Sequence, residues 1–434
     1  MPPCVVVARA APPFGYRQRV STGYDSLGPA SLGPNYRKLW SASAVSNLAD
    51  GIFVVALPLI AVSLTTSPAL VAGVSIAARL PWLVFVLFAG ALADRLDRRA
   101  TMRNVQLMRV LVVGVMAALA LSGGLSLPLL YVAAFALGIG ETLFDTAAQS
   151  IMPSIVPREL LSRANGRLYA VELAMNAFVG PPLGGLLVAV SVPLALGGSV
   201  VGYGLAAIGL ALLVGSFRPR SDGGSRSMVA EIREGFGFVW HNSVLRPLVI
   251  MLAASNMANS AVVAVFVLFA VAPGPLGLDE LGYGLLITTM AVGGIAGSLA
   301  EERVETRVGR SNVLFGVVIV AGVATLIPVF TANVLAVAAG MVALGAAFMM
   351  WNIITVSLRQ RITPDQLLGR MNATYRLFAW GVMPLGALLG GLIAETMGLR
   401  AVFVVAGLLS LAMLVFRPYL GDAALDAAEL STGG

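Results

Sequence analysis

Four ionisable residues stand inside long apolar stretches of this chain: Asp50, Arg79, Glu141 and Asp145. A charge at bilayer depth costs about 2.5–3.5 kcal/mol on insertion scales, so each of them is a functional candidate. Glu141 and Asp145 are four residues apart and therefore share one face of a helix. Two carboxylates so placed in a low dielectric repel each other, which favours the protonation of one of them. The pair predicts a proton-coupling site, with Asp50 and Arg79 as its electrostatic neighbours.

Arg79 is the expected counter-ion of Asp50 or Asp145. The alternative is that such a pair is permanent and purely structural. Arg109 and Glu172 lie nearer the ends of their apolar stretches, from where long side chains can reach the membrane interface, and they are weaker candidates.

The corresponding places in the second half of the chain are polar but mostly uncharged, and Asn352 stands 207 residues after Asp145. We interpret this as a division of labour in which the first half handles protons and both halves contact substrate. Methionines and aromatics at such positions are more often packing residues, so an adaptable apolar lining is only one reading of them. The candidates for the substrate cavity are Asn47, Asn256, Asn259, Trp351, Asn352 and Arg376.

Composition indicates which kind of secondary structure holds these residues. Hydrophobic residues make up 58% of the 434 and charged residues only 11%, and apolar runs long enough to cross a bilayer recur along the chain. Such spans must be helical, because an isolated strand would leave its amides unpaired in lipid. We therefore expect an all-α membrane protein with twelve transmembrane helices at 40–64, 69–92, 104–122, 127–148, 168–190, 195–216, 245–271, 282–300, 312–330, 333–356, 372–394 and 399–417.

The chain also repeats itself. The stretch from Gly90 to Asp94 reappears from Gly297 to Glu301, an offset of 207, and further matches follow at the same offset. This duplication predicts two pseudo-symmetric six-helix bundles with substrate handled between them. The expected division is a tail at 1–38, predicted to be disordered from its prolines and glycines, then halves at 39–217 and 245–418, a polar linker at 218–244 and a second tail at 419–434. The amphipathic stretch 228–240 within the linker is either a helix on the membrane surface or a plain tether.

Arginines mark one side of the membrane. They cluster in the tail and in the even-numbered connections, whereas the connections near Ser67, Gly124, Pro193, Pro275 and Asn333 carry none, and only Arg400 breaks the pattern. The positive-inside rule then places both termini and the linker in the cytoplasm of a bacterial cell, with the chain in the plasma (inner) membrane. Nucleic-acid binding is not expected, because the net charge of +7 forms no continuous basic face.

Two motifs carry a family resemblance. Gly90, Asp94, Arg95, Arg98 and Arg99 resemble the loop between spans two and three of the major facilitator superfamily, although Asp97 replaces that loop's second glycine. In span five, Gly180, Pro181, Gly184 and Gly185 are similar to the core of the motif associated with antiporters. The resemblance is to the subgroup holding the enterobactin exporter and macrolide efflux proteins. It implies that the loop gates the cytoplasmic side; the alternative is that its arginines only fix the topology. It also implies that the span-five motif takes part in exchange; the alternative is that its residues only pack the helices.

These observations predict a secondary transporter, a proton-coupled antiporter that exports a small amphiphilic compound such as a siderophore, a macrolide or another drug-like metabolite. A proton-coupled importer of the same fold is the alternative. One cysteine in the tail and one histidine between spans argue against an enzyme and against a metal site, and no cofactor is expected. The expected partners are the substrate, protons and the lipid bilayer, and we expect the chain to act as a monomer.

Overall fold

The computed structural model of the protein describes residues 32–93, 97–215, 217 and 228–430. Over these residues the regular structure is helical, apart from one isolated bridge between Val271 and Leu278. The first half holds α1 (Pro34–Leu64), α2 (Pro68–Ala93), α3 (Arg98–Leu121), α4 (Leu127–Ile155), η1 (Arg158–Leu160), α5 (Leu161–Glu172), η2 (Leu173–Val179), α6 (Gly180–Val190) and α7 (Val192–Ala211). After α8 (Met228–His241) come α9 (Leu245–Ala270), α10 (Glu280–Val308), α11 (Arg310–Phe330), α12 (Val334–Ile362), α13 (Asp365–Gly381), α14 (Met383–Met397), α15 (Leu399–Ala412), η3 (Met413–Tyr419) and α16 (Asp422–Leu430).

The helices account for the expected crossings of a membrane. Eleven helical segments within the described residues are long and apolar enough to span a bilayer. The remaining segment is α2, whose described apolar stretch Pro68–Leu83 is shorter. Together they match the twelve predicted spans, so the prediction of an all-α polytopic membrane protein is confirmed.

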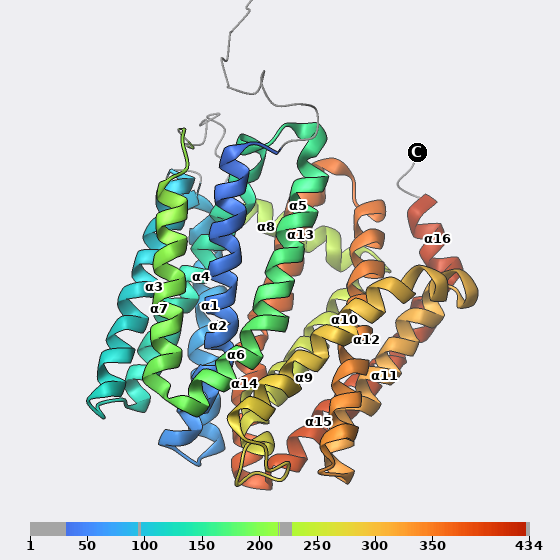
Figure 1. Ribbon diagram of the computed structural model, residues 1–434. Coiled ribbons are helices and arrows are strands. Elements are labelled where there is room, and N and C mark those ends of the chain that lie inside the picture. Colours follow the sequence, from blue (N-terminus) through green and yellow to red (C-terminus); the bar gives the residue numbers. More distant parts are fainter. Residues whose placement is uncertain (1–31, 94–96, 216, 218–227, 431–434) are drawn as a thin grey trace, which may run out of the picture.

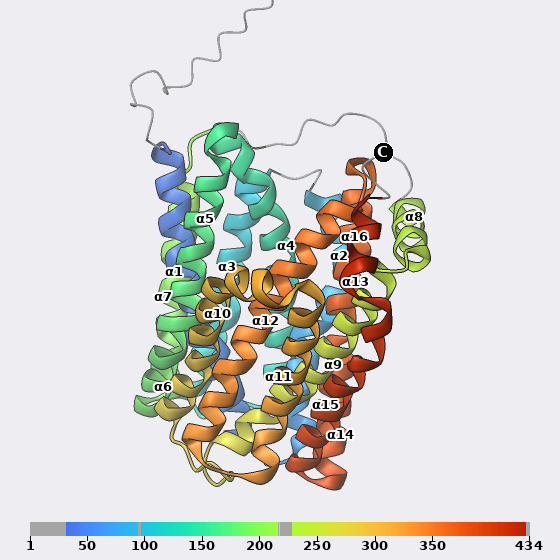
Figure 2. The same cartoon turned by 90° about the vertical axis from the view of Figure 1, so that its right-hand side faces the viewer.

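The two halves lie side by side, with α1–α7 on one side and α9–α15 on the other (Figure 1). We call the end that holds the start of α1, α8 and α16 the terminal face, and the opposite end, with the connections at 65–67, 122–126, 271–279 and 331–333, the loop face (Figures 1 and 2). The halves contact each other mainly through α2 with α14 and α6 with α10. Because α6 and α14 are the loop-face parts of their spans, the halves are closed together at the loop face.

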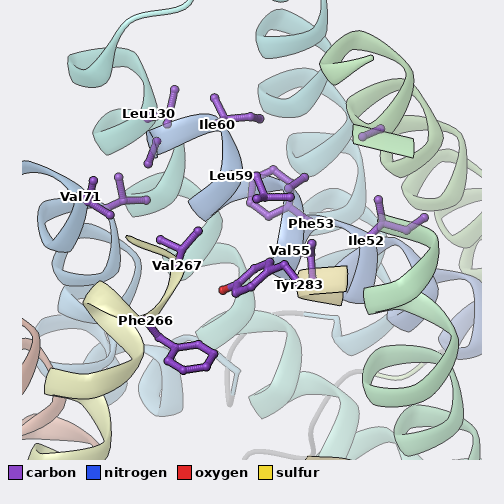
Figure 3. Close-up of a cluster of buried hydrophobic side chains, with 14 of the residues drawn as sticks. Ile52, Phe53, Val55, Leu59, Ile60, Val71, Leu130, Phe266, Val267 and Tyr283 are labelled. Atoms are coloured by element: carbon purple, nitrogen blue, oxygen red, sulfur yellow. The ribbon is translucent and has the colours of Figure 1, made fainter. Parts of the chain in front are cut away.

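Apolar packing holds the loop-face contact together. Figure 3 shows Phe53, Val55 and Leu59 of α1 beside Val267 of α9 and Tyr283 of α10. All five are buried, and they belong to one cluster that includes residues of both halves. Burial of this surface therefore stabilises the closure at the loop face.

Two spans lose regular α-helical geometry near their middle. The fifth span runs from α5 through the π-helical stretch η2 into α6. The eleventh span is interrupted at Val382, between α13 and α14. Pro181 and Pro384 stand just after these interruptions, and proline removes a backbone donor at each place.

Two further helices lie on the terminal face. The amphipathic stretch of the linker is helical as α8, and Glu234 on it forms an ion pair of 2.6 Å with Arg370 of α13. The C-terminal stretch contains α16, whose Leu425 is fully buried against the second half. Glu429 of α16 pairs with Arg310 at the start of α11. The linker residues 218–227 and residues 1–31 of the predicted tail lie outside the described residues.

Candidate functional site

A buried ion pair joins α1 to α3 within the first half. Nη1 of Arg109 lies 3.1 Å from Oδ1 and 3.3 Å from Oδ2 of Asp50. Tyr203 of α7 donates its hydroxyl to the same carboxylate at 2.8 Å. Arg109 is only 5% exposed, whereas the Asp50 side chain keeps 27% of its surface accessible. The site is thus a partly accessible carboxylate held by a cation and a phenol from two other helices.

Aromatic rings and a second hydrogen bond surround this pair. The Arg109 guanidinium lies 5.5 Å from the ring centre of Phe144 and 5.3 Å from that of Tyr203. Such contacts compensate a cation for part of the water it has lost. One turn before Asp50, Ser46 accepts a hydrogen bond of 2.8 Å from Gln106, which stands one turn before Arg109. The α1–α3 seam therefore holds two successive polar contacts.

The expected counter-ion of Asp50 was wrong: Arg109 takes that place, and Arg79 is an exposed residue of α2. The predicted third span began at residue 104, which put Arg109 near its end. In the structure α3 begins at Arg98, and the Arg109 side chain is buried against Asp50 instead of extending toward the membrane interface. Asp97, an N-cap residue type directly before Arg98, is the sequence signal that could have predicted this start of α3.

The two predicted coupling carboxylates of the fourth span both lie on α4. Glu141 is half-buried on a helix that packs against both α1 and α3. The side chain of Asp145 lies outside the described residues, so the predicted pair of carboxylates stays a prediction. Glu141 therefore lies on the helix next to the two that carry the Asp50–Arg109 pair.

The loop motif falls partly outside the described residues, which omit Asp94 and Arg95. Gly90 lies in the last turns of α2. Arg98 donates to the Ser154 hydroxyl at 3.5 Å, and Arg99 donates to the Leu213 carbonyl at 2.6 Å. Both of these hydrogen bonds lie within the first half. The predicted gating role stays a prediction in this arrangement, in which the halves meet at the loop face.

Asp97, the residue that departs from the motif, has a clear structural role. Its carboxylate caps α3 by accepting from the Ala100 amide at 2.9 Å, and it also accepts from the Phe217 amide at 3.3 Å. The substitution thus ties the start of α3 to the chain that follows α7. Where the motif has a glycine, this chain therefore has the N-cap residue of α3.

The span-five glycines allow very close backbone contact. A Cβ atom at Gly180 would lie 2.5 Å from Cα of Gly51 in α1, and one at Gly184 would lie 2.7 Å from the Ile52 carbonyl. Gly185 faces the other half, where a Cβ atom would lie 2.2 Å from the Glu280 carbonyl of α10. The motif, which includes the buried Pro181, therefore packs span five against both halves at once.

The predicted cavity residues divide into two groups. Asn47 and Asn352 each donate a side-chain hydrogen bond to a carbonyl one turn back in their own helix. The acceptors are the carbonyls of Ser43 and Phe348. Asn256 instead donates to the Ala379 carbonyl at 2.7 Å and so links α9 to the end of α13. Their contacts with substrate stay predictions. Of the other candidates, Trp351 is buried at 9% exposure and Asn259 is exposed.

Arg376 lies where α13 meets α2. Its guanidinium is 5.0 Å from the ring centre of Trp380 and 5.9 Å from that of Trp82. The two indoles come from different halves and meet edge to face, with centroids 3.8 Å apart and planes at 83°. Sequence reasoning named Arg376 but missed both tryptophans, because only the fold brings residues 82 and 380 together.

Two six-helix halves that meet at one face, with ionisable groups buried inside, define a major facilitator transporter and not an enzyme. A family model described as "transmembrane secretion effector" matches residues 27–430. The chain belongs to that family, and it is a multi-pass membrane transporter.

Curated relatives extend over most of the chain. The multidrug efflux pump Tap of Mycolicibacterium fortuitum is 29% identical over 409 residues, which cover 89% of this chain and 96% of that pump. Macrolide efflux protein A of Streptococcus pyogenes is 22% identical over 391 residues, which cover 88% of this chain and 95% of that protein. The resemblance to efflux members of the superfamily is therefore confirmed.

Solved structures share the fold. The nucleoside transporter NupG superposes with a TM-score of 0.69 at 12% identity, covering 91% of this chain and 99% of NupG. A bacterial homologue of the iron transporter ferroportin, solved in an inward-facing state, gives a TM-score of 0.68 at 15% identity and covers 91% of this chain and 98% of that one. At these identities the likeness establishes the fold alone.

Proposed function

We propose that this protein exports a small amphiphilic, drug-like compound across a bacterial plasma membrane in exchange for protons. The observation that carries the proposal is the buried Asp50–Arg109–Tyr203 cluster with Glu141 beside it. A carboxylate inside a membrane protein that keeps part of its surface accessible is suited to bind and release a proton. Curated relatives that cover most of the chain are named as efflux pumps, which supports export over import.

The arginine pattern indicates the side of the membrane toward which the structure is open. If the arginine-rich terminal face lies in the cytoplasm, the structure is closed toward the outside and faces inward. In this state the substrate enters from the cytoplasm. A proton taken up from outside at Asp50, Glu141 or Asp145 competes with Arg109 for the carboxylate charge, and its release to the cytoplasm resets the pair.

The test uses inside-out vesicles with an acidic interior. Adding a transported dye should dissipate part of the pH gradient, because dye entering the vesicle exchanges for protons leaving it. Asp50→Asn, Glu141→Gln and Asp145→Asn, made separately, should reduce this proton release more than they weaken dye binding. Glu159→Gln, at an exposed position of η1, is the matched control and should behave as wild type.

Three results would oppose the proposal. Full proton release in all three variants would place coupling elsewhere. Dye leaving the vesicles as protons leave would indicate an importer. Uphill dye uptake that persists after the proton gradient is collapsed would exclude proton coupling altogether.

A further inference from the structure

The cluster of Trp82, Arg376 and Trp380 joins the two halves. Trp82 is on α2 of the first half, and the other two residues are on α13 of the second. Trp82 stands near the middle of α2, and Trp380 ends α13 just before the interruption at Val382. The cluster therefore lies mid-way along its spans, at a place where a bound molecule would contact both halves.

Two polar groups of the cluster have hydrogen-bonding capacity to spare. Trp82 is 4% exposed, yet its Nε1 has no acceptor among the described residues. A buried donor left unsatisfied costs about 1–3 kcal/mol, so such a group normally has a partner in some state of the molecule. Arg376 is half-buried, and no carboxylate whose side chain is described forms an ion pair with it.

The chemistry of these groups selects one kind of ligand. A guanidinium binds carboxylate and similar anions through paired charge-assisted hydrogen bonds, and the indole N–H adds a further donor. The half-buried indole of Trp380 offers an aromatic face for a flat ring system, next to the nearly buried Trp82. By contrast, the negative charge of Asp50 is already matched by Arg109, so that carboxylate is not an open counter-ion for a cationic drug.

We propose that the transported compound is a planar aromatic anion, whose carboxylate or enolate group binds Arg376 and Trp82 while its ring system packs on the indoles. This rests on the proposed export function and narrows it to one charge class. It also assigns Trp82 and Trp380, which the sequence did not suggest, as substrate contacts.

The experiment compares two dyes of opposite charge on the same xanthene scaffold. Fluorescein, an anion, and rhodamine 6G, a cation, are titrated with purified full-length protein, and binding is followed by fluorescence polarisation. We expect fluorescein to bind more tightly. Arg376→Gln should raise its Kd by about tenfold or more, Arg376→Lys should raise it less, and Trp82→Phe should weaken it by removing the N–H donor.

Rhodamine 6G serves as the internal control for folding, because its Kd should be unchanged or lowered in Arg376→Gln. Arg417→Gln, which changes an exposed arginine near the end of the chain, should affect neither dye. Tighter binding of rhodamine 6G to wild type, an equal loss of both dyes in Arg376→Gln, or no saturable fluorescein binding would each overturn the proposal. Since the assay needs no proton gradient, its failure is distinct from a failure of proton-coupled export.

Discussion

Removing Arg109 should destabilise the protein by leaving Asp50 without its cation. Among the described residues, the carboxylate would keep the hydrogen bond of 2.8 Å from Tyr203. Breaking a buried ion pair by removing one partner costs about 3–5 kcal/mol. Because Asp50 keeps 27% of its side-chain surface, we place Arg109→Met at the lower end, about 3 kcal/mol.

A double variant separates stability from coupling. Asp50→Asn alone removes the carboxylate charge that lies 3.1 Å from the Arg109 guanidinium and should also destabilise the protein. Combined with Arg109→Met, it removes both charges and still offers Tyr203 an acceptor, so most of the lost stability should return. Proton-coupled export should nevertheless remain absent, because the titratable carboxylate is gone.

Stability is measured as the Tm of the purified protein in detergent, and export as proton release in inside-out vesicles. Arg400→Met, which changes an exposed arginine of α15, is the control for losing a positive charge and should leave both readouts unchanged. If the Tm losses of the two single variants simply add in the double variant, Arg109 and Asp50 are not coupled. If the double variant still exports with proton exchange, the pair is structural only.

Three further predictions concern the faces of the molecule and the seams between the halves. Gly185→Val should abolish transport in vesicles by forcing α6 away from α10. Gly197→Val, where a Cβ atom meets nothing within 4 Å, should leave the transport rate unchanged. Equal rates in the two variants would show that the α6–α10 contact is not needed for transport. In a chain without Cys4, a cysteine at Thr66 should react with an impermeant thiol reagent in intact cells and one at Ser243 should not, and the reverse pattern would invert the assigned topology. Glu395→Ala should speed amide hydrogen exchange in the first turn of α2. The Glu395 carboxylate accepts from the Ser67 hydroxyl at 2.7 Å and from the Ala69 amide at 3.2 Å, across the seam between the halves. Unchanged exchange would show that this contact does not stabilise the start of α2.

Much of the fold could be predicted because lipid imposes simple rules. Length and hydropathy placed the ends of α4, α9 and α11 within a few residues at the loop face. The terminal face was less predictable, since helices there continue past the apolar core into polar sequence. For that reason α3 begins at Arg98 and α10 ends at Val308, beyond the predicted spans 104–122 and 282–300.

The candidate site could be predicted only in part. Asp50 and Arg376 were recognisable because a charge in an apolar run is rare. Arg109 and Trp82 were not recognisable as their partners, because they reach them only through packing between distant segments, whereas Trp380 lies one turn after Arg376 on the same helix. The docked helix α16 was likewise expected only as a tail, although its alanine-rich sequence with Asp422 in the first turn favours a helix.

The interruptions of spans five and eleven predict unequal tolerance to sequence change. In span five the π-helical stretch Leu173–Val179 rearranges the hydrogen bonding of the backbone itself. Around Val382, by contrast, Asn256 donates to the Ala379 carbonyl and Ser260 donates to the Met383 carbonyl at 2.7 Å. A substitution at either of these side chains of α9 can therefore disturb the bend of span eleven. The bend of span five depends on backbone hydrogen bonds of the π-helical stretch. Natural variants of this transporter should accordingly carry fewer changes at Asn256 and Ser260 than at the side chains of the π-helical stretch.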